Sequence, residues 1–225
     1  MSARAEIFAN VRHALAVSGN EAPRRRSVED RLRHAPQGVI PARGQGDAAA
    51  RLALFRDEAE RVSADVTELE SAQQIPAAIA TFLHDRNLPA RLRCGSDPYL
   101  AALSWEATGL HVEKGRADPS DLVCVSHAFA GVAETGTLVL TSGGDNPTTL
   151  NFLPDTHIVV LNAADIVGDY EAAWQKLRMV YGKGLMPRTV NFITGPSRSA
   201  DIGHSLLLGA HGPRTLHILV VNEGA

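Results

Sequence analysis

Cysteine is scarce in this sequence, and its scarcity excludes one kind of redox centre. The 225 residues include two cysteines, Cys94 and Cys124, and no Cys-x-x-Cys pair. An iron–sulfur cluster is normally held by four thiolates, so this chain is not expected to hold one by itself. We expect both cysteines to be small buried side chains in a reducing compartment, and any iron–sulfur cluster to belong to a partner.

Long apolar runs and several common catalytic motifs are also missing. The chain has no apolar run of about 18 residues and no hydrophobic signal segment, so we expect a cytoplasmic protein without a membrane span. Its 9 histidines form no metal-binding spacing such as His-Glu-x-x-His, and we predict no metal site and no cofactor in this chain. A Walker-type loop, Gly-x-Gly-x-x-Gly after a strand and Gly-x-Ser-x-Gly are absent too, which disfavours nucleotide-binding and serine-hydrolase sites.

Lysine is rare as well, and the basic residues, mostly arginines, are enriched towards the N-terminus. Residues 1–62 contain 11 basic and 8 acidic residues, whereas the remaining residues contain 11 and 17. No aromatic platform or recognised nucleic-acid motif accompanies the basic quarter. We therefore predict an arm that packs on a partner or a symmetry mate, and no nucleic-acid binding.

Proline and glycine indicate where this arm ends. Residues 1–46 are predicted to form an N-terminal helical arm and linker, with residues 20–46 extended. Residues 47–225 are predicted to form one α/β domain with a mostly parallel sheet flanked by helices, because strand-like and helix-like stretches alternate along them. The predicted strands are residues 65–70, 90–94, 110–114, 121–126, 137–141, 157–161, 189–194 and 216–221, and the predicted helices are residues 47–63, 72–87, 97–108 and 169–182.

An acid in an otherwise small and apolar turn is the first candidate for chemistry. Glu134 lies in an Ala-Glu-Thr-Gly-Thr turn that opens a predicted strand. Burying a lone acid is costly unless it has a partner or a task. We consider three roles: a nucleophile or base, a group that organises a ligand pocket with Thr135, Gly136 and Thr137, or a structural carboxylate that accepts backbone hydrogen bonds.

A glycine-rich loop, residues 142–147, follows the same predicted strand. Gly143 and Gly144 allow backbone N–H groups to approach a ligand, and a short helix predicted to start at Pro147 would add unpaired donors. This combination predicts an anion site. The alternative is an ordinary connecting loop, because Gly-Gly-Asp-Asn is common turn chemistry.

Two further loops near the C-terminal end contain candidate ligand-binding residues. A predicted strand runs into Gly-Pro-Ser-Arg-Ser, which places Ser197 and Arg198 at its carboxyl end, where open α/β sheets bind ligands. His211 lies in Gly-Ala-His-Gly-Pro-Arg, just before the last predicted strand. The alternatives are an ion pair of Arg198 with an acid and a surface turn at His211.

Four stretches, in this order, resemble the lactate-utilization (LUD) domain family, and in particular its lactate-utilization protein C branch. They are Ala133–Thr137, Leu153–Ile158, Gly195–Ile202 and Gly209–Arg214, and the resemblance covers roughly residues 60–223. It implies an α/β fold like that of ribose-5-phosphate isomerase, glucosamine-6-phosphate deaminase and the CoA transferases. Asp155, in the second stretch, joins the candidate ligand-binding residues.

The resemblance also implies a function. It implies a bacterial system that oxidises L-lactate to pyruvate, in which other subunits are iron–sulfur and cysteine-rich oxidoreductases. We expect this chain to be a non-redox subunit that binds a small-molecule anion or helps assembly, and self-association is compatible with that role. The alternative is a stand-alone enzyme that uses Glu134 as nucleophile or base, although Ala-Glu-Thr-Gly-Thr departs from the Ser-Glu-Asn-Gly motif of the transferases.

Overall fold

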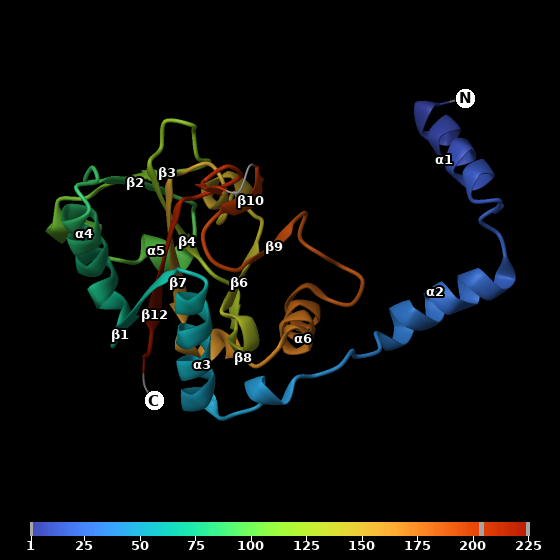
Figure 1. Cartoon of the computed structure of the whole chain (residues 1–225), viewed down its shortest axis with the longest axis horizontal. Helices are drawn as coiled ribbons and strands as arrows, with labels where there is room; N and C mark the ends of the chain where they lie inside the picture. The colour runs from blue at the N-terminus through green and yellow to red at the C-terminus, as the bar shows by residue number, and fades with distance from the viewer. Residues whose placement is uncertain (1, 203–204, 224–225) are drawn as a thin grey trace. The chain divides into compact units, whose positions relative to one another are not determined.

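The computed structural model describes residues 2–202 and 205–223, and the chain forms two compact units, Met1–Val39 and Ile40–Ala225 (Figure 1). Residues 40–46 fall in the second unit. There the backbones of Gly44 and Gly168 pack so closely that a Cβ on Gly44 would lie 2.1 Å from the carbonyl oxygen of Gly168. In the described ranges, no helix has the length and apolarity needed to cross a membrane.

The first unit contains two helices, α1 (Ala3–Ala14) and α2 (Ala22–His34). Helix α2 corrects the prediction of an extended linker over residues 20–46. Its proline stands in the first turn, where no helical hydrogen bond is lost, and the residues that follow are mostly good helix formers. An ion pair of 3.6 Å between Glu29 and Arg33 spans one turn of α2. Neither of these two helices buries a residue.

Six strands of the second unit form a sheet in the order β1-β12-β7-β4-β2-β3. Every neighbouring pair is parallel, which confirms the predicted α/β fold and brings all carboxyl ends of these strands to one edge. The strands are β1 (Asp65–Leu69), β2 (Arg91–Cys94), β3 (His111–Lys114), β4 (Val123–His127), β7 (Thr156–Asn162) and β12 (Thr215–Val221). The helices of this unit are α3 (Ala48–Arg61), α4 (Ile75–Asp85), α5 (Pro98–Ala101) and α6 (Tyr170–Tyr181), with short 3-10 turns η1 (Ala42–Gly44), η2 (Ala72–Gln74), η3 (Trp105–Thr108), η4 (Ala133–Thr135), η5 (Thr148–Asn151) and η6 (Ala163–Asp165).

Side chains that alternate along β7 build a core on both faces of this sheet. Ile158 and Val160 pack with the apolar face of α4, whereas Val159 and Leu161 pack with Phe55 of α3 and with the second sheet. A strand buried on both faces needs a continuous apolar run, which is what β7 has. Figure 1 shows α4 and α3 on either side of strands β1 and β12.

The second sheet has four strands in the order β8-β5-β6-β9. The strands predicted at residues 137–141 and 189–194 belong to it, and β6 runs antiparallel to both β5 and β9. The short turn between β5 and β6 explains the antiparallel pairing of these two strands, because a parallel pair would need a crossover of a dozen or more residues. The remaining strands are β5 (Ala130–Val132), β6 (Thr137–Thr141), β8 (Ile166–Val167), β9 (Val190–Ile193) and the antiparallel pair β10 (Arg198–Ile202) and β11 (Ser205–Leu208).

Candidate functional site

The Ala-Glu-Thr-Gly-Thr turn is buried beside the start of α6. Glu134 is 5% exposed, and its Oε1 accepts a hydrogen bond of 3.3 Å from the N–H of Tyr170, the first residue of α6. A helix N-terminus has unpaired N–H groups and a partial positive charge, so this carboxylate stabilises α6. The contact fits the structural role among the three considered, and a chemical role for Glu134 stays a prediction.

The threonines of this turn belong to a cluster of hydroxyl groups. Oγ1 of Thr137 lies 2.7 Å from Oγ1 of both Thr135 and Thr194, and 3.0 Å from the hydroxyl of Tyr170. Gly136 has a φ of +62° and packs against the backbone of α3. These predicted ligand-binding residues therefore connect β6 with α3 and α6, and they do not line either of the two cavities described below.

Replacing Glu134 with glutamine is expected to lower the free energy of unfolding by about 1 kcal/mol, because the amide keeps an acceptor and loses the charge near the N-terminus of α6. Urea unfolding followed by circular dichroism at pH 7 measures this change. The matched control is Glu106→Gln at an exposed position, for which a change within about 0.5 kcal/mol is expected. Equal losses in the two variants would contradict the proposed contact.

The glycine-rich loop closes over the carboxyl end of β2. The N–H of Gly143 donates to the carbonyl of Asn146 over 3.3 Å, and the carbonyl of Gly144 accepts a hydrogen bond of 3.3 Å from the chain that follows β2. A Cβ on Gly95 would lie 1.7 Å from the carbonyl oxygen of Asp145, so the two backbones need glycine there. These contacts build a tight turn, and the predicted anion site in it stays a prediction.

Ser197, Arg198 and His211 meet around one cavity of about 240 Å³ between the two sheets, which we call the inter-sheet cavity. Ser197 joins its two loops: the N–H of Ser197 donates to the carbonyl of Pro213 over 2.8 Å, and its Oγ accepts the N–H of His211 over 3.2 Å. Arg198 and His211 are exposed, whereas His157 lies buried in the wall. The three predicted residues are therefore brought together by the fold.

The position of this cavity differs from the predicted one. Arg198 follows β9, which lies in the second sheet, so the cavity opens at the amino ends of β7 and β12 and not at the carboxyl edge of the parallel sheet. Asp155 stands beside it and connects β7 with the loop before β12. Its carbonyl accepts the N–H of Arg214 over 2.8 Å, and its carboxylate lies 3.7 Å from Nε of the same arginine. Both side chains are exposed, so this ion pair contributes little to stability.

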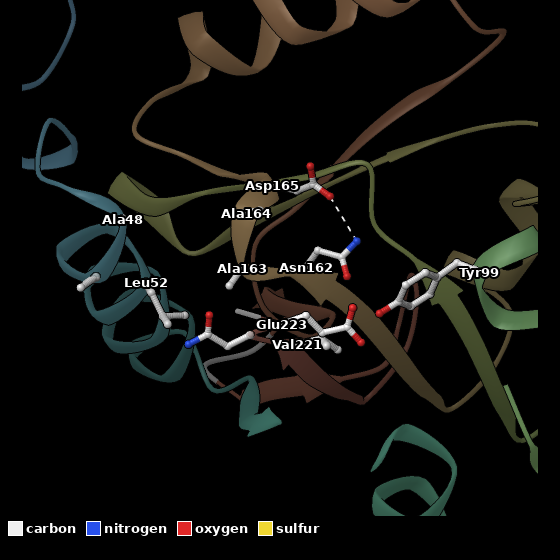
Figure 2. Close-up of a pocket in the computed structure, with 11 residues that line it drawn as sticks. Ala48, Leu52, Tyr99, Asn162, Ala163, Ala164, Asp165, Val221 and Glu223 are labelled. Carbon is white, nitrogen blue, oxygen red and sulfur yellow. Dashed lines mark hydrogen bonds between the residues drawn. The ribbon is translucent and has the colours of Figure 1, made fainter. Parts of the chain in front are cut away.

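A second cavity of about 410 Å³ lies at the carboxyl edge of the parallel sheet, and we call it the carboxyl-edge cavity (Figure 2). Asn162 is the last residue of β7, and Glu223 follows β12. Tyr99, Asp165 and Asn222 also contribute to its polar lining. Figure 2 shows the polar ends of Tyr99, Asn162 and Glu223 directed towards the same space. Open α/β sheets commonly bind ligands at this edge, which makes the cavity a candidate site.

Polar contacts run from Asp97 to Lys176 beside the carboxyl-edge cavity. His127, the last residue of β4, places Nδ1 3.4 Å from Oδ2 of Asp97 and Nε2 3.3 Å from Nδ2 of Asn162. Asn162 also donates to Asp165 over 3.4 Å, and Nζ of Lys176 lies 2.5 Å from the other oxygen of that carboxylate. With the amide nitrogen of Asn162 facing it, Nε2 is the accepting nitrogen of the ring, and Nδ1 is the nitrogen that donates to Asp97. A histidine held in this way can accept a proton.

Burial and hydrogen bonding act on Asp97 in opposite directions. Burial raises the pKa of Asp97, but hydrogen bonds from His127 and from the N–H of Leu100 hold the net pKa below its usual range. Tyr99 stacks on His127 with ring centroids 4.6 Å apart. Burial, together with the carboxylate of Glu223, raises the pKa of Tyr99. The imidazole is therefore placed between a carboxylate and a neutral phenol at pH 7.

His127 lies just before the Ala-Glu-Thr-Gly-Thr turn in the sequence, and from the sequence alone a hydrogen-bonded structural role is favoured over proton transfer for it. The other residues of this network were missed. A usable signal was present, because polar residues stand at or just after the ends of neighbouring strands. Asp97 follows β2, His127 ends β4, Asn162 ends β7 and Glu223 follows β12. Carboxyl ends of parallel strands lie at one edge, and the observed strand order makes these strands neighbours, which is why the polar residues converge.

Both cysteines are buried, as the sequence predicts, and neither forms a disulfide. Burial raises the pKa of Cys124 to about 12 and also raises the pKa of Cys94. The thiolate is the form that binds metals, so these thiols are poorly prepared as ligands. Within the residues that the structure describes, no group of three or more histidine, cysteine, aspartate and glutamate side chains is placed to hold a metal ion.

A sequence model of the LUD domain matches residues 52–221, which is most of the chain. The chain belongs to the LUD domain family. This confirms the family predicted from the four stretches, and it covers the whole six-stranded sheet of the second unit.

Relatives of this LUD domain include proteins named Lactate utilization protein C. One from Geobacillus sp. (strain WCH70) is 42% identical over 120 residues, which are 53% of this chain and 49% of the relative. Another from Exiguobacterium sp. is 31% identical over 182 residues, 76% of this chain and 78% of the relative. The match therefore covers about half the length of the Geobacillus relative and 78% of the length of the Exiguobacterium relative. A crystal structure of a DUF162 family protein from Deinococcus radiodurans shares the fold, with a TM-score of 0.61, 23% identity and coverage of 78% of this chain and 99% of that one.

Three of the four stretches that indicated the LUD family border the inter-sheet cavity. Residues 153–158 contribute His157, residues 195–202 contribute Ser197 and Arg198, and residues 209–214 contribute His211. The remaining stretch, Ala133–Thr137, contains Glu134, whose carboxylate accepts a hydrogen bond at the N-terminus of α6. Most of the sequence stretches that indicate the LUD family therefore lie around one cavity.

Proposed function

We propose that this chain serves lactate utilisation as a ligand-binding or assembly subunit of a system that oxidises L-lactate to pyruvate. The relatives named Lactate utilization protein C support the pathway. The observation that carries a ligand-binding role is the meeting of three family stretches around the inter-sheet cavity, with Arg198 exposed there. A guanidinium can bind a carboxylate through two parallel N–H donors, which suits a small organic anion.

In this proposal the electrons are carried by partner subunits. The two thiols of this chain are buried with raised pKa values, so iron–sulfur and cysteine-rich oxidoreductase partners in the cytoplasm are the better carriers. The inter-sheet cavity would hold the organic anion while a partner removes its electrons.

Growth on a single carbon source tests the proposal. Cells that lack this chain are expected to stop growing on L-lactate and to keep growing on pyruvate, because only the oxidation step is lost. Re-expression of the chain should restore growth on L-lactate, and the tagged chain should co-purify with iron–sulfur proteins. Unchanged growth on L-lactate without the chain would refute the proposed function.

A further inference from the structure

A buried polar relay stands behind the wall of the inter-sheet cavity. It consists of Ser126 in β4, Asn151 at the end of η5 and His157 in β7, and these residues are 2%, 1% and 0% exposed. Oγ of Ser126 lies 3.0 Å from Nε2 of His157 and 3.3 Å from Oδ1 of Asn151. The hydroxyl therefore connects the imidazole with the amide.

Two nitrogens of the relay have no hydrogen-bond partner among the residues that the structure describes: Nδ2 of Asn151 and Nδ1 of His157. A buried polar group without a hydrogen-bond partner is destabilising, so native proteins rarely contain one without a reason. Both residues also line the inter-sheet cavity. A molecule bound in that cavity is the natural partner for the two free atoms.

The proton positions of the relay define what such a molecule must offer. Burial lowers the pKa of His157 to about 3, so its imidazole is neutral. If Nε2 of His157 donates to Ser126, the hydroxyl donates to Asn151, which leaves a lone pair on the imidazole and an amide donor. If the hydroxyl instead donates to Nε2, the amide of Asn151 is turned to donate to the hydroxyl, which leaves an imidazole donor and an amide acceptor. Either arrangement leaves one donor and one acceptor.

A hydroxyl group on the bound molecule can pair with both the free donor and the free acceptor of the relay, because a hydroxyl donates one hydrogen bond and accepts others. A keto group can only accept, and a methylene group can do neither. Arg198 and His211, exposed residues of the same cavity, supply donors for a carboxylate. Phe152, Ile193 and Leu216 give the cavity apolar walls suited to a short carbon chain.

We propose that the inter-sheet cavity binds a small 2-hydroxy carboxylate, with the relay recognising its hydroxyl group and Arg198 its carboxylate. This inference rests on the proposed function for the choice of ligand, and it adds the groups that select it. Ser126, Asn151 and His157 would distinguish a 2-hydroxy acid from the 2-oxo acid formed by its oxidation, so the product would leave more readily than the substrate.

Isothermal titration calorimetry of the full chain at pH 7 with L-lactate, pyruvate and propionate tests the inference. L-lactate is expected to bind at least about tenfold more tightly than propionate, which lacks the hydroxyl, with pyruvate in between. Asn151→Ala should reduce the affinity for L-lactate to nearly that for propionate and leave propionate unchanged. Arg198→Gln should lower the affinity for all three acids alike, by about tenfold or more. Arg116→Gln, at an exposed position away from the cavity, should leave the three affinities unchanged.

Equal affinity of the unmodified chain for L-lactate and propionate, or no binding of any of the three acids, would overturn the inference. The ligand series needs no variant, so a misfolded Asn151→Ala protein would not prevent the decision. The growth experiment decides the proposed function separately. Suppose that cells need the chain for growth on L-lactate but the purified chain does not bind L-lactate more tightly than propionate. The proposed function would then stand, and only the recognition of the hydroxyl group by the relay would be refuted.

Discussion

Replacing Gly136 with alanine is expected to destabilise the second unit by about 3 to 5 kcal/mol. Gly136 has a φ of +62°, which costs an L-residue about 1–2 kcal/mol. A Cβ there would also lie 2.3 Å from the backbone nitrogen of Ala59 and 2.6 Å from its Cα. These are backbone atoms in the last turn of α3, so the clash can be relieved only by moving the helix end away from the turn.

Urea unfolding followed by circular dichroism measures the effect of Gly136→Ala. Gly144→Ala is the matched control, because a Cβ on Gly144 meets no atom within 4 Å and its φ is not positive. A change within about 0.5 kcal/mol is expected for the control. If the two alanine variants were equally stable, the packing of the Ala-Glu-Thr-Gly-Thr turn on α3 would be refuted.

Mild acid is expected to destabilise the protein through two buried histidines. Burial lowers the pKa of His157 to about 3 and that of His217 to about 4, both from an ordinary value of 6.5. The unfolded chain therefore binds protons near pH 6.5 while the folded chain does not. Their contribution to stability is present above pH 6.5 and is lost as the pH falls towards the folded pKa values. From pH 7 to pH 5 we expect a loss of about 2 kcal/mol for each histidine.

Urea unfolding at pH 7, 6 and 5 measures this loss, and a stability that stayed flat over the range would contradict it. His217→Gln should reduce the loss by about half, whereas His84→Gln, at an exposed position, should leave it unchanged. Stopping at pH 5 separates the histidines from acids such as Asp97 and Asp121. The pKa values of these acids are lowered from 3.8, so their stabilising contribution is lost mainly below about pH 5.

The elements that the sequence predicts well are those with a strong local pattern. Residues 158–161 are a continuous apolar run, and the strand predicted at residues 157–161 is observed as β7. The helix predicted at residues 169–182 corresponds to α6, which Asp169 caps through a hydrogen bond of 2.9 Å to the N–H of Ala172. Apolar spacing and a capping residue are properties of neighbouring residues, so they can be recognised without the fold.

Elements whose signal is short or not local were missed. Strands β5 and β8 have three and two residues, too few to show a period. Helix α2 was missed because prolines and glycines around residues 20–46 outweighed its short helical pattern. The second sheet was not separated from the first, since the assignment of a strand to a sheet depends on its hydrogen-bond partners.

The sequence by itself determined the family and the parallel α/β core, and it named Ser197, Arg198 and His211 among a larger set of ligand-binding candidates. Only the tertiary structure placed Glu134 under α6, brought Asp97 to His127 and joined Asn151, Ser126 and His157 behind the inter-sheet cavity. The reason is physical. Helix and strand periods arise from residues a few positions apart, whereas these contacts join residues 25 to 36 positions apart, and the packing of strands, helices and loops decides which of them meet.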